Sequence, residues 1–65
     1  MVIFVKFIDL DGGSFRKEVY LPCIPRENEE LLVAGDTYIV TSVKYELYTD
    51  KVFMVVEKKD TLNVY

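Results

Sequence analysis

The feature that most constrains the fold is the close spacing of turn signals between runs of β-branched and aromatic residues. Asp11-Gly12-Gly13-Ser14 separates the first two runs, because glycine accepts the positive φ angles of tight turns. No helix-length apolar pattern appears between the breaks, so every run is predicted to be a strand. The expected strands cover residues 2–10, 15–21, 31–33, 37–48 and 51–58, and residues 62–65 would add a short closing strand.

The alternation of apolar residues predicts a bent sheet. Tyr38 and Val40 have one parity, whereas Val43, Tyr45 and Leu47 have the other. A bulge at residues 41–42 would direct both groups toward one core, because an extra residue resets the alternation. We therefore expect residues 1–65 to form a single all-β domain, a small, strongly bent antiparallel barrel of five to six strands, SH3-like or OB-like.

A chain of 65 residues buries little of its surface, and small folds usually gain stability from disulfides, metals or oligomerisation. Cys23 is the only cysteine and histidine is absent, so neither an intrachain disulfide nor an ordinary zinc site is expected. Self-association is the route that this elimination leaves open. The unpaired thiol and the absence of a targeting or membrane-spanning segment predict a cytoplasmic location.

The residue inventory argues against an enzyme with a cofactor or metal. Without histidine there is no imidazole base and no Ser-His or Cys-His pair. Cys23, between two prolines, is expected to be packed and inert. The carboxylates at 9, 11, 27, 29 and 30 are best explained as solvated loops. The net charge of −3 disfavours nucleic acid, because phosphate binding relies on Lys and Arg.

Two strands carry more apolar residues than a one-sided sheet needs. Residues 2–8 are apolar on both parities apart from Lys6, and residues 52–56 contain no polar residue. A second cover is expected, and another subunit is the favoured one. The alternative is that the 22–30 loop and the C-terminal tail cover these faces. The predicted oligomer interface consists of Phe4, Val52, Phe53, Met54 and Val55.

Tyrosines outside the core parity suggest a ligand site. Tyr38 and Tyr45 have core-like periodicity, whereas other tyrosines lie off that parity or near strand ends. With nearby cations, such rings could hold the base and phosphate of a small nucleotide. The alternative is ordinary barrel surface, where tyrosine is common. The candidate ligand-binding residues are Arg16, Tyr20, Arg26, Lys44 and Tyr48.

One segment resembles small β-barrel proteins common in bacteriophages and prophages. Their shared pattern is a Pro-Arg-x-Gly-Glu-x-Val loop followed by a Tyr-x-Val-x-x-Val strand. Here the loop is Pro25-Arg26-Glu27-Asn28-Glu29-Glu30-Leu31 and the strand continues from Tyr38-Ile39-Val40 to Val43. The resemblance covers residues 22–57. Asn28 replaces the glycine of the pattern and is expected to tolerate a left-handed turn. Arg26 and Glu29 are expected to brace the loop.

The resemblance implies a phage-encoded accessory protein and not a housekeeping enzyme, so a non-catalytic binding protein in the host cytoplasm is expected, and the apolar surplus predicts that it is oligomeric. Some small phage β-proteins of this sort inhibit host antiviral defence, either by sequestering a nucleotide immune signal or by docking on a defence protein, and this is the function expected here. The alternative that the resemblance implies is a structural or assembly protein that forms a homo-oligomeric ring without a small-molecule ligand. A nucleic-acid-binding barrel is a third reading, weakened by the net charge.

Overall fold

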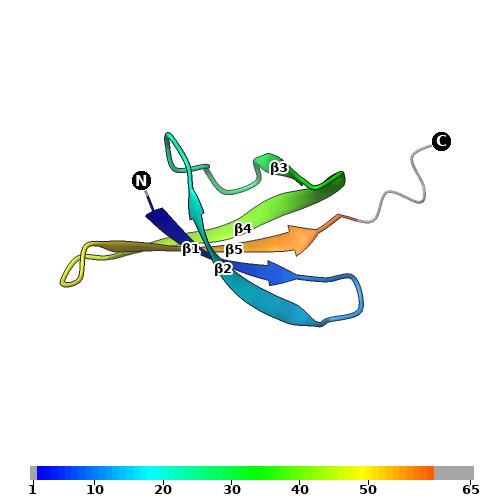
Figure 1. Cartoon of the computed structure of the whole chain (residues 1–65), viewed down its shortest axis with the longest axis horizontal. Coiled ribbons are helices and arrows are strands. Elements are labelled where there is room, and N and C mark those ends of the chain that lie inside the picture. The colour runs from blue at the N-terminus through cyan, green and yellow to red at the C-terminus, as the bar shows by residue number, and fades with distance from the viewer. Residues whose placement is uncertain (1, 60–65) are drawn as a thin grey trace.

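The computed structural model describes residues 2–59, which form five strands in one sheet (Figure 1). The predicted closing strand at 62–65 lies outside these residues. None of the described residues forms a helix long and apolar enough to cross a membrane. The strands are β1 (Val2–Ile8), β2 (Ser14–Tyr20), β3 (Glu30–Val33), β4 (Asp36–Glu46) and β5 (Lys51–Lys58).

The sheet has the order β2-β1-β5-β4-β3 and curls strongly into a half-barrel. This confirms the predicted all-β, small and strongly bent architecture. Three of the neighbouring pairs are antiparallel, as expected, whereas β1 and β5 run parallel, with Ile3 opposite Val52. The parallel pair arises because β4 and β5 form a hairpin, and β5 then returns beside β1 in the same direction.

The bend in β4 contains the predicted bulge. The register with β5 shifts between Val40 and Ser42, and the Thr41 hydroxyl donates a hydrogen bond to the carbonyl of Val55 at 3.1 Å. Val40 is fully buried, and Val43 packs against the core from beyond the bulge. The extra residue therefore keeps both parities of β4 on the inner face.

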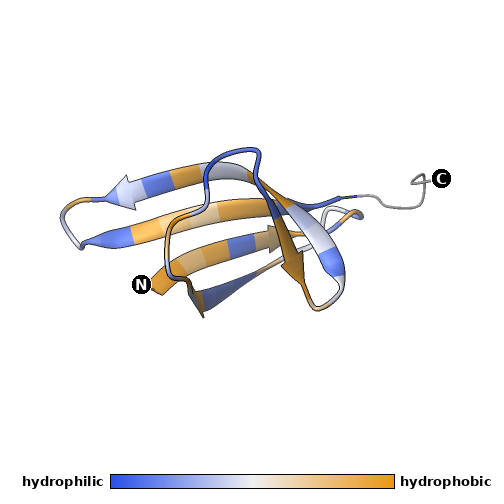
Figure 2. Cartoon of the chain, turned by 90° about the horizontal axis from the view of Figure 1, so that it is seen from above, coloured by the Kyte–Doolittle hydropathy of each residue, from blue (hydrophilic) through white to orange (hydrophobic). Residues whose placement is uncertain are grey.

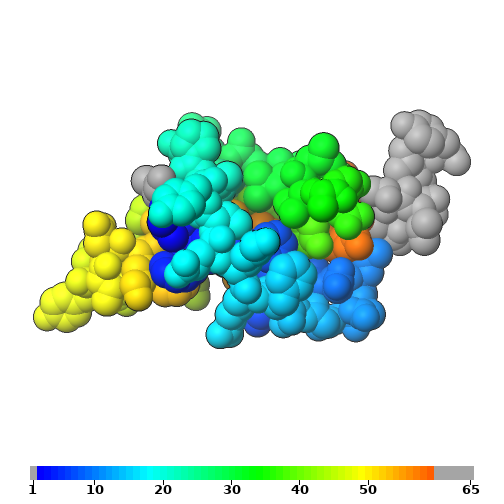
Figure 3. All heavy atoms as spheres, viewed as in Figure 1, coloured from blue at the N-terminus to red at the C-terminus, as the bar shows by residue number. Residues whose placement is uncertain are grey.

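Toward the C-terminal end of β4, its inner face is exposed. Tyr45 is 62% and Leu47 is 88% exposed, so the prediction that they join the core is wrong. Tyr45 lies opposite Val52, where the pairing of β5 with β1 begins. The hairpin between β4 and β5 projects beyond that point, as Figures 1 and 3 show in yellow. None of the five described strands pairs with β5 beyond Val52 on the β1 side, which leaves the projecting part with two strands.

The core lies on the concave face of the half-barrel. Figure 2 shows hydrophobic residues along most of β5, the central strand of the sheet, and of β1 beside it. The Phe7 ring stacks on Phe15 at 4.8 Å between centroids and meets Tyr38 edge-on at 5.3 Å. The buried residues are Ile3, Val5, Phe7, Tyr38, Val40, Val52, Met54 and Val56.

The loop between β2 and β3 follows the sequence prediction at Asn28. Its φ angle is +73°, in the left-handed region. The Glu29 carboxylate accepts a hydrogen bond from the backbone N–H of Arg26, which confirms that these residues brace the loop. The Asn28 N–H also donates to the carbonyl of Val40 at 2.7 Å and ties the loop to β4. Cys23, in the same loop, is exposed, so the expectation of a packed cysteine is wrong.

Lys58, the last residue of β5, forms ion pairs with aspartates in two other segments. Its Nζ lies 3.4 Å from Asp36 Oδ2 and 3.8 Å from Asp9 Oδ1. The hydrogen bond and the charge of Asp36 raise the pKa of Lys58, and Asp9 adds to the effect. This cation therefore links β5 to the β1–β2 turn and to the first residue of β4.

Candidate functional site

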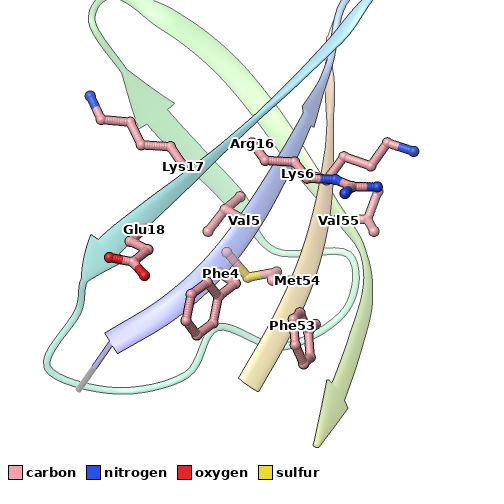
Figure 4. A pocket seen from close by; sticks show the side chains of 9 residues that line it. All are labelled: Phe4, Val5, Lys6, Arg16, Lys17, Glu18, Phe53, Met54 and Val55. Carbon is pink, nitrogen blue, oxygen red and sulfur yellow. The ribbon is translucent and has the colours of Figure 1, made fainter. Parts of the chain in front are cut away.

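The convex, outer face of the sheet carries an open hollow of about 560 Å³ where β2, β1 and β5 lie side by side (Figure 4). Val5 and Met54 border it but are buried on the inner parity, so the side chains that face the hollow come from the alternate positions. The lining residues are Phe4, Val5, Lys6, Arg16, Lys17, Glu18, Phe53, Met54 and Val55.

Two phenylalanine rings form the apolar floor of the hollow. The parallel register places Phe4 of β1 beside Phe53 of β5, and their rings stack at 5.5 Å between centroids. Phe53 remains 43% exposed. The Lys51 Nζ lies 5.3 Å from the centre of the Phe4 ring, a cation–π distance. The exposed ring of Phe53, packed on the half-buried Phe4, offers a stacking surface to a planar ligand.

Positive side chains surround this aromatic pair. Lys6 lies opposite Arg16 across β1 and β2, and Figure 4 shows the two side chains extending beside each other near Val55. Lys44 of β4 lies opposite Phe53. Together with Lys51 these are four cations; the carboxylates on the same central part of the face are Glu18, opposite Phe4, and Glu46, opposite Lys51. The local net charge is therefore +2, although the whole chain carries −3.

The structure brings together only part of the predicted ligand site. Arg16 lines the hollow and Lys44 lies at its β5 side. Tyr20 is on the outer parity of β2 but opposite Val2, at the end of the strand, and is 82% exposed. Arg26 lies in the loop before β3, and Tyr48 is fully exposed in the β4–β5 turn. These five residues do not form one pocket.

The predicted oligomer interface is divided between the two faces. Phe4, Phe53 and Val55 are on the outer face and line the hollow. Val52 and Met54 are buried in the core at 7% and 1% exposure, so they cannot contribute to a contact on the outer face. The reason is the period of two, which the uniformly apolar run 52–56 conceals.

The structure adds Lys6, Glu18 and Lys51 to the site. Lys6 is the only polar residue in β1 and shares the parity of Phe4, so its place beside the rings could have been found from the sequence. The position of Lys51 over Phe4 depends on the parallel pairing of β1 with β5, which no local pattern indicates.

A second, smaller hollow of about 320 Å³ lies beside the projecting hairpin, where Ile24, Tyr45 and Leu47 contribute apolar surface. Within residues 2–59 there is no group of three or more cysteine or carboxylate side chains that could hold a metal ion. Comparison with protein-family models, with curated proteins and with solved structures finds no match for this chain.

Proposed function

We propose that this protein is a non-catalytic, phage-encoded binding protein that captures a small nucleotide in the hollow on its outer face. By holding a nucleotide immune signal it would counter host antiviral defence. The observation that carries the proposal is the stacked pair of half-buried Phe4 and exposed Phe53, at the centre of a net positive patch on an acidic protein.

The chemistry of the patch matches the two parts of a nucleotide. A base can stack on the exposed ring of Phe53, a contact worth about 1–3 kcal/mol. The guanidinium of Arg16 can bind a phosphate through two parallel hydrogen bonds, and Lys6 beside it adds a second positive charge. The chain has no histidine to act as a base, which favours holding the ligand over converting it.

The second candidate is a structural or assembly protein with no small-molecule ligand. Exposed Phe53 and half-buried Val55 on the outer face and the open side of β2 favour it, because both surfaces suit contact with further subunits. Docking of the outer face on a defence protein uses the same apolar residues. If the protein acts by assembly or by docking, and not by nucleotide capture, the purified protein carries no extra mass of nucleotide size.

Native mass spectrometry of the protein freshly purified from infected or expressing cells tests the proposal directly. Extra mass of nucleotide size identifies the ligand class, which is then titrated by calorimetry. Arg16→Ala and Phe53→Ser are expected to weaken binding at least tenfold, since each removes about 1.4 kcal/mol or more of stacking or charge-assisted contact.

Matched controls separate the hollow from the rest of the surface. Arg26→Ala removes the same side chain as Arg16→Ala from the distant loop, and Leu32→Ser removes an exposed apolar residue of β3. Both are expected to leave binding unchanged. Absence of a nucleotide adduct, together with no binding of mono- or cyclic oligonucleotides in the titration, would refute capture and leave assembly or docking.

A further inference from the structure

β2 is an open edge of the sheet. It pairs with β1 along all seven residues and contacts none of the other three strands within residues 2–59. Only Val19 of the strand is partly buried, and Figure 3 shows β2 in cyan lying across the front of the molecule. The strand contains no proline or bulge that would block a further partner.

The hydrogen-bonding direction of β2 follows from the turn that precedes it. The Asp9 N–H donates to the carbonyl of Gly13 at 2.7 Å, so these opposed residues form a hydrogen-bonded pair. Such pairs alternate along an antiparallel ladder. Lys17 and its inner-parity neighbours therefore bond to β1, and the backbone groups that face the open edge belong to Ser14, Arg16, Glu18 and Tyr20.

A second copy can use those groups only in a few registers. A two-fold axis perpendicular to the sheet places one residue of β2 opposite itself. With Lys17 at the axis the two strands overlap along their whole length, Ser14 lies opposite Tyr20, and Arg16 lies opposite Glu18. All four edge-facing residues are then in hydrogen-bonded pairs, because Lys17 occupies a non-hydrogen-bonded position.

The side chains of β2 are complementary in the same register. Arg16 of each copy faces Glu18 of the other, and neither residue forms an ion pair with another described residue within its own chain. On the opposite face, Phe15 meets Val19 of the second copy. Registers centred on Arg16 or Glu18 place like charges at the axis just as the Lys17 register does, but they also leave part of the strand unpaired and lose the Arg16–Glu18 pairs. Opposed charges and aromatic–β-branched pairs are the contacts that stabilise antiparallel strands.

We propose that two copies of this chain pair antiparallel through β2, with Lys17 at the two-fold axis, and join their sheets into one of ten strands. Because Arg16 and Glu18 border the outer hollow, the two hollows then lie on either side of the axis. The inference goes beyond ligand capture and does not depend on it, since the pairing uses backbone and side-chain groups of β2 alone.

Disulfide trapping tests the register. In a Cys23→Ser background, Lys17→Cys faces its own copy at a Cα separation of about 4.5 Å, within the range of a disulfide. Mild oxidation without ligand is expected to convert most of this variant to covalent dimer. In the same register Arg16 lies opposite Glu18 of the second copy and not opposite the second Arg16. Arg16→Cys is therefore expected to crosslink at least tenfold more slowly. Equal crosslinking of the two variants, or none of Lys17→Cys, would overturn the proposal.

Charge exchange provides an independent test in solution. Arg16→Glu and Glu18→Arg each place like charges opposite each other and are expected to shift sedimentation toward monomer. The double exchange restores the opposed charges and is expected to restore the dimer, with circular dichroism confirming that all variants fold. A monomeric wild-type protein, or a double exchange no better than either single one, contradicts the pairing. Loss of nucleotide binding in these variants would not, because dimer formation is measured without nucleotide.

Discussion

Asn28 shows how one residue fixes the loop that connects the two halves of the sheet. Its φ of +73° is costly for most side chains but mild for asparagine, and its N–H anchors the loop to Val40. Glycine would adopt the same conformation without strain, so asparagine and glycine are interchangeable for this turn.

Substitutions at Asn28 should therefore follow backbone preference. Asn28→Ala is expected to lower the free energy of unfolding by about 1 kcal/mol, because alanine lacks the local stabilisation of the left-handed region. Asn28→Gly is expected to leave stability within about 0.5 kcal/mol. Urea unfolding followed by circular dichroism measures both, and equal losses for the two variants would contradict the explanation.

Lys58 gives the fold a dependence on alkaline pH. Asp36 raises its pKa above the usual value of 10.5, so the folded state favours the protonated amine. This contribution is complete below pH 10.5 and is lost as the pH rises through the higher folded-state pKa. Wild type should lose more thermal stability than Lys58→Met between about pH 9 and about pH 11.5. Melting curves at the two values measure the difference; parallel losses would argue against this role.

At the scale of the strands, the sequence predicted local features well and pairing poorly. The turns at 11–14 and 49–50, the strand bounds and the bulge in β4 all follow from residues that are neighbours in the chain. The parallel pairing of β1 with β5 joins residues far apart in sequence, and no local rule encodes it.

The same distinction explains the errors in the candidate site. Arg16 and Lys44 were found as single cations, but their meeting point around Phe4 and Phe53 required the strand order. Tyr45 has the parity of a core residue but is exposed. Parity shows on which face of the strand a side chain lies, but not whether another segment packs against that face.

The two faces of β5 should differ sharply in their contribution to stability. Val56→Ala truncates a fully buried side chain and is expected to cost about 2 kcal/mol. Val55→Ala removes the same atoms from the outer face and is expected to cost less than half as much. Chemical unfolding of the two variants under one condition gives the comparison. A larger loss at Val55 would mean that the outer face is covered in the folded protein.

At the scale of the whole molecule, charge is distributed unevenly. The chain carries −3, yet the central outer face is positive, so its acidic groups lie mainly in the loops and at strand ends. A net negative protein repels long nucleic acids, whereas a local positive patch still attracts a small anion at short range. This arrangement supports the proposal that the ligand is a small nucleotide and not a polymer.

The proposed dimer places two like charges together at its axis. Lys17→Thr removes this repulsion and is expected to tighten dimer formation by roughly two- to five-fold, the effect of one unfavourable cross-strand pair. Sedimentation equilibrium gives the dissociation constant. Lys59→Thr, which removes the same charge just after the end of β5, where Lys59 pairs with Glu30 far from the axis, serves as the control. Weaker association of Lys17→Thr would show that Lys17 is not at the axis.

The parallel contact between β1 and β5 also governs how the chain reaches its fold. During synthesis β1 emerges first. Its neighbour β5, which pairs with β1 at Ile3 and Phe7, is the last of the five strands to emerge. A nascent chain can form the β1–β2 hairpin early and must then keep its apolar side chains exposed until β5 has left the ribosome. Pairings between distant segments form slowly, because the intervening loop must be closed first. The incomplete chain is therefore the species on which chaperones and proteases can act.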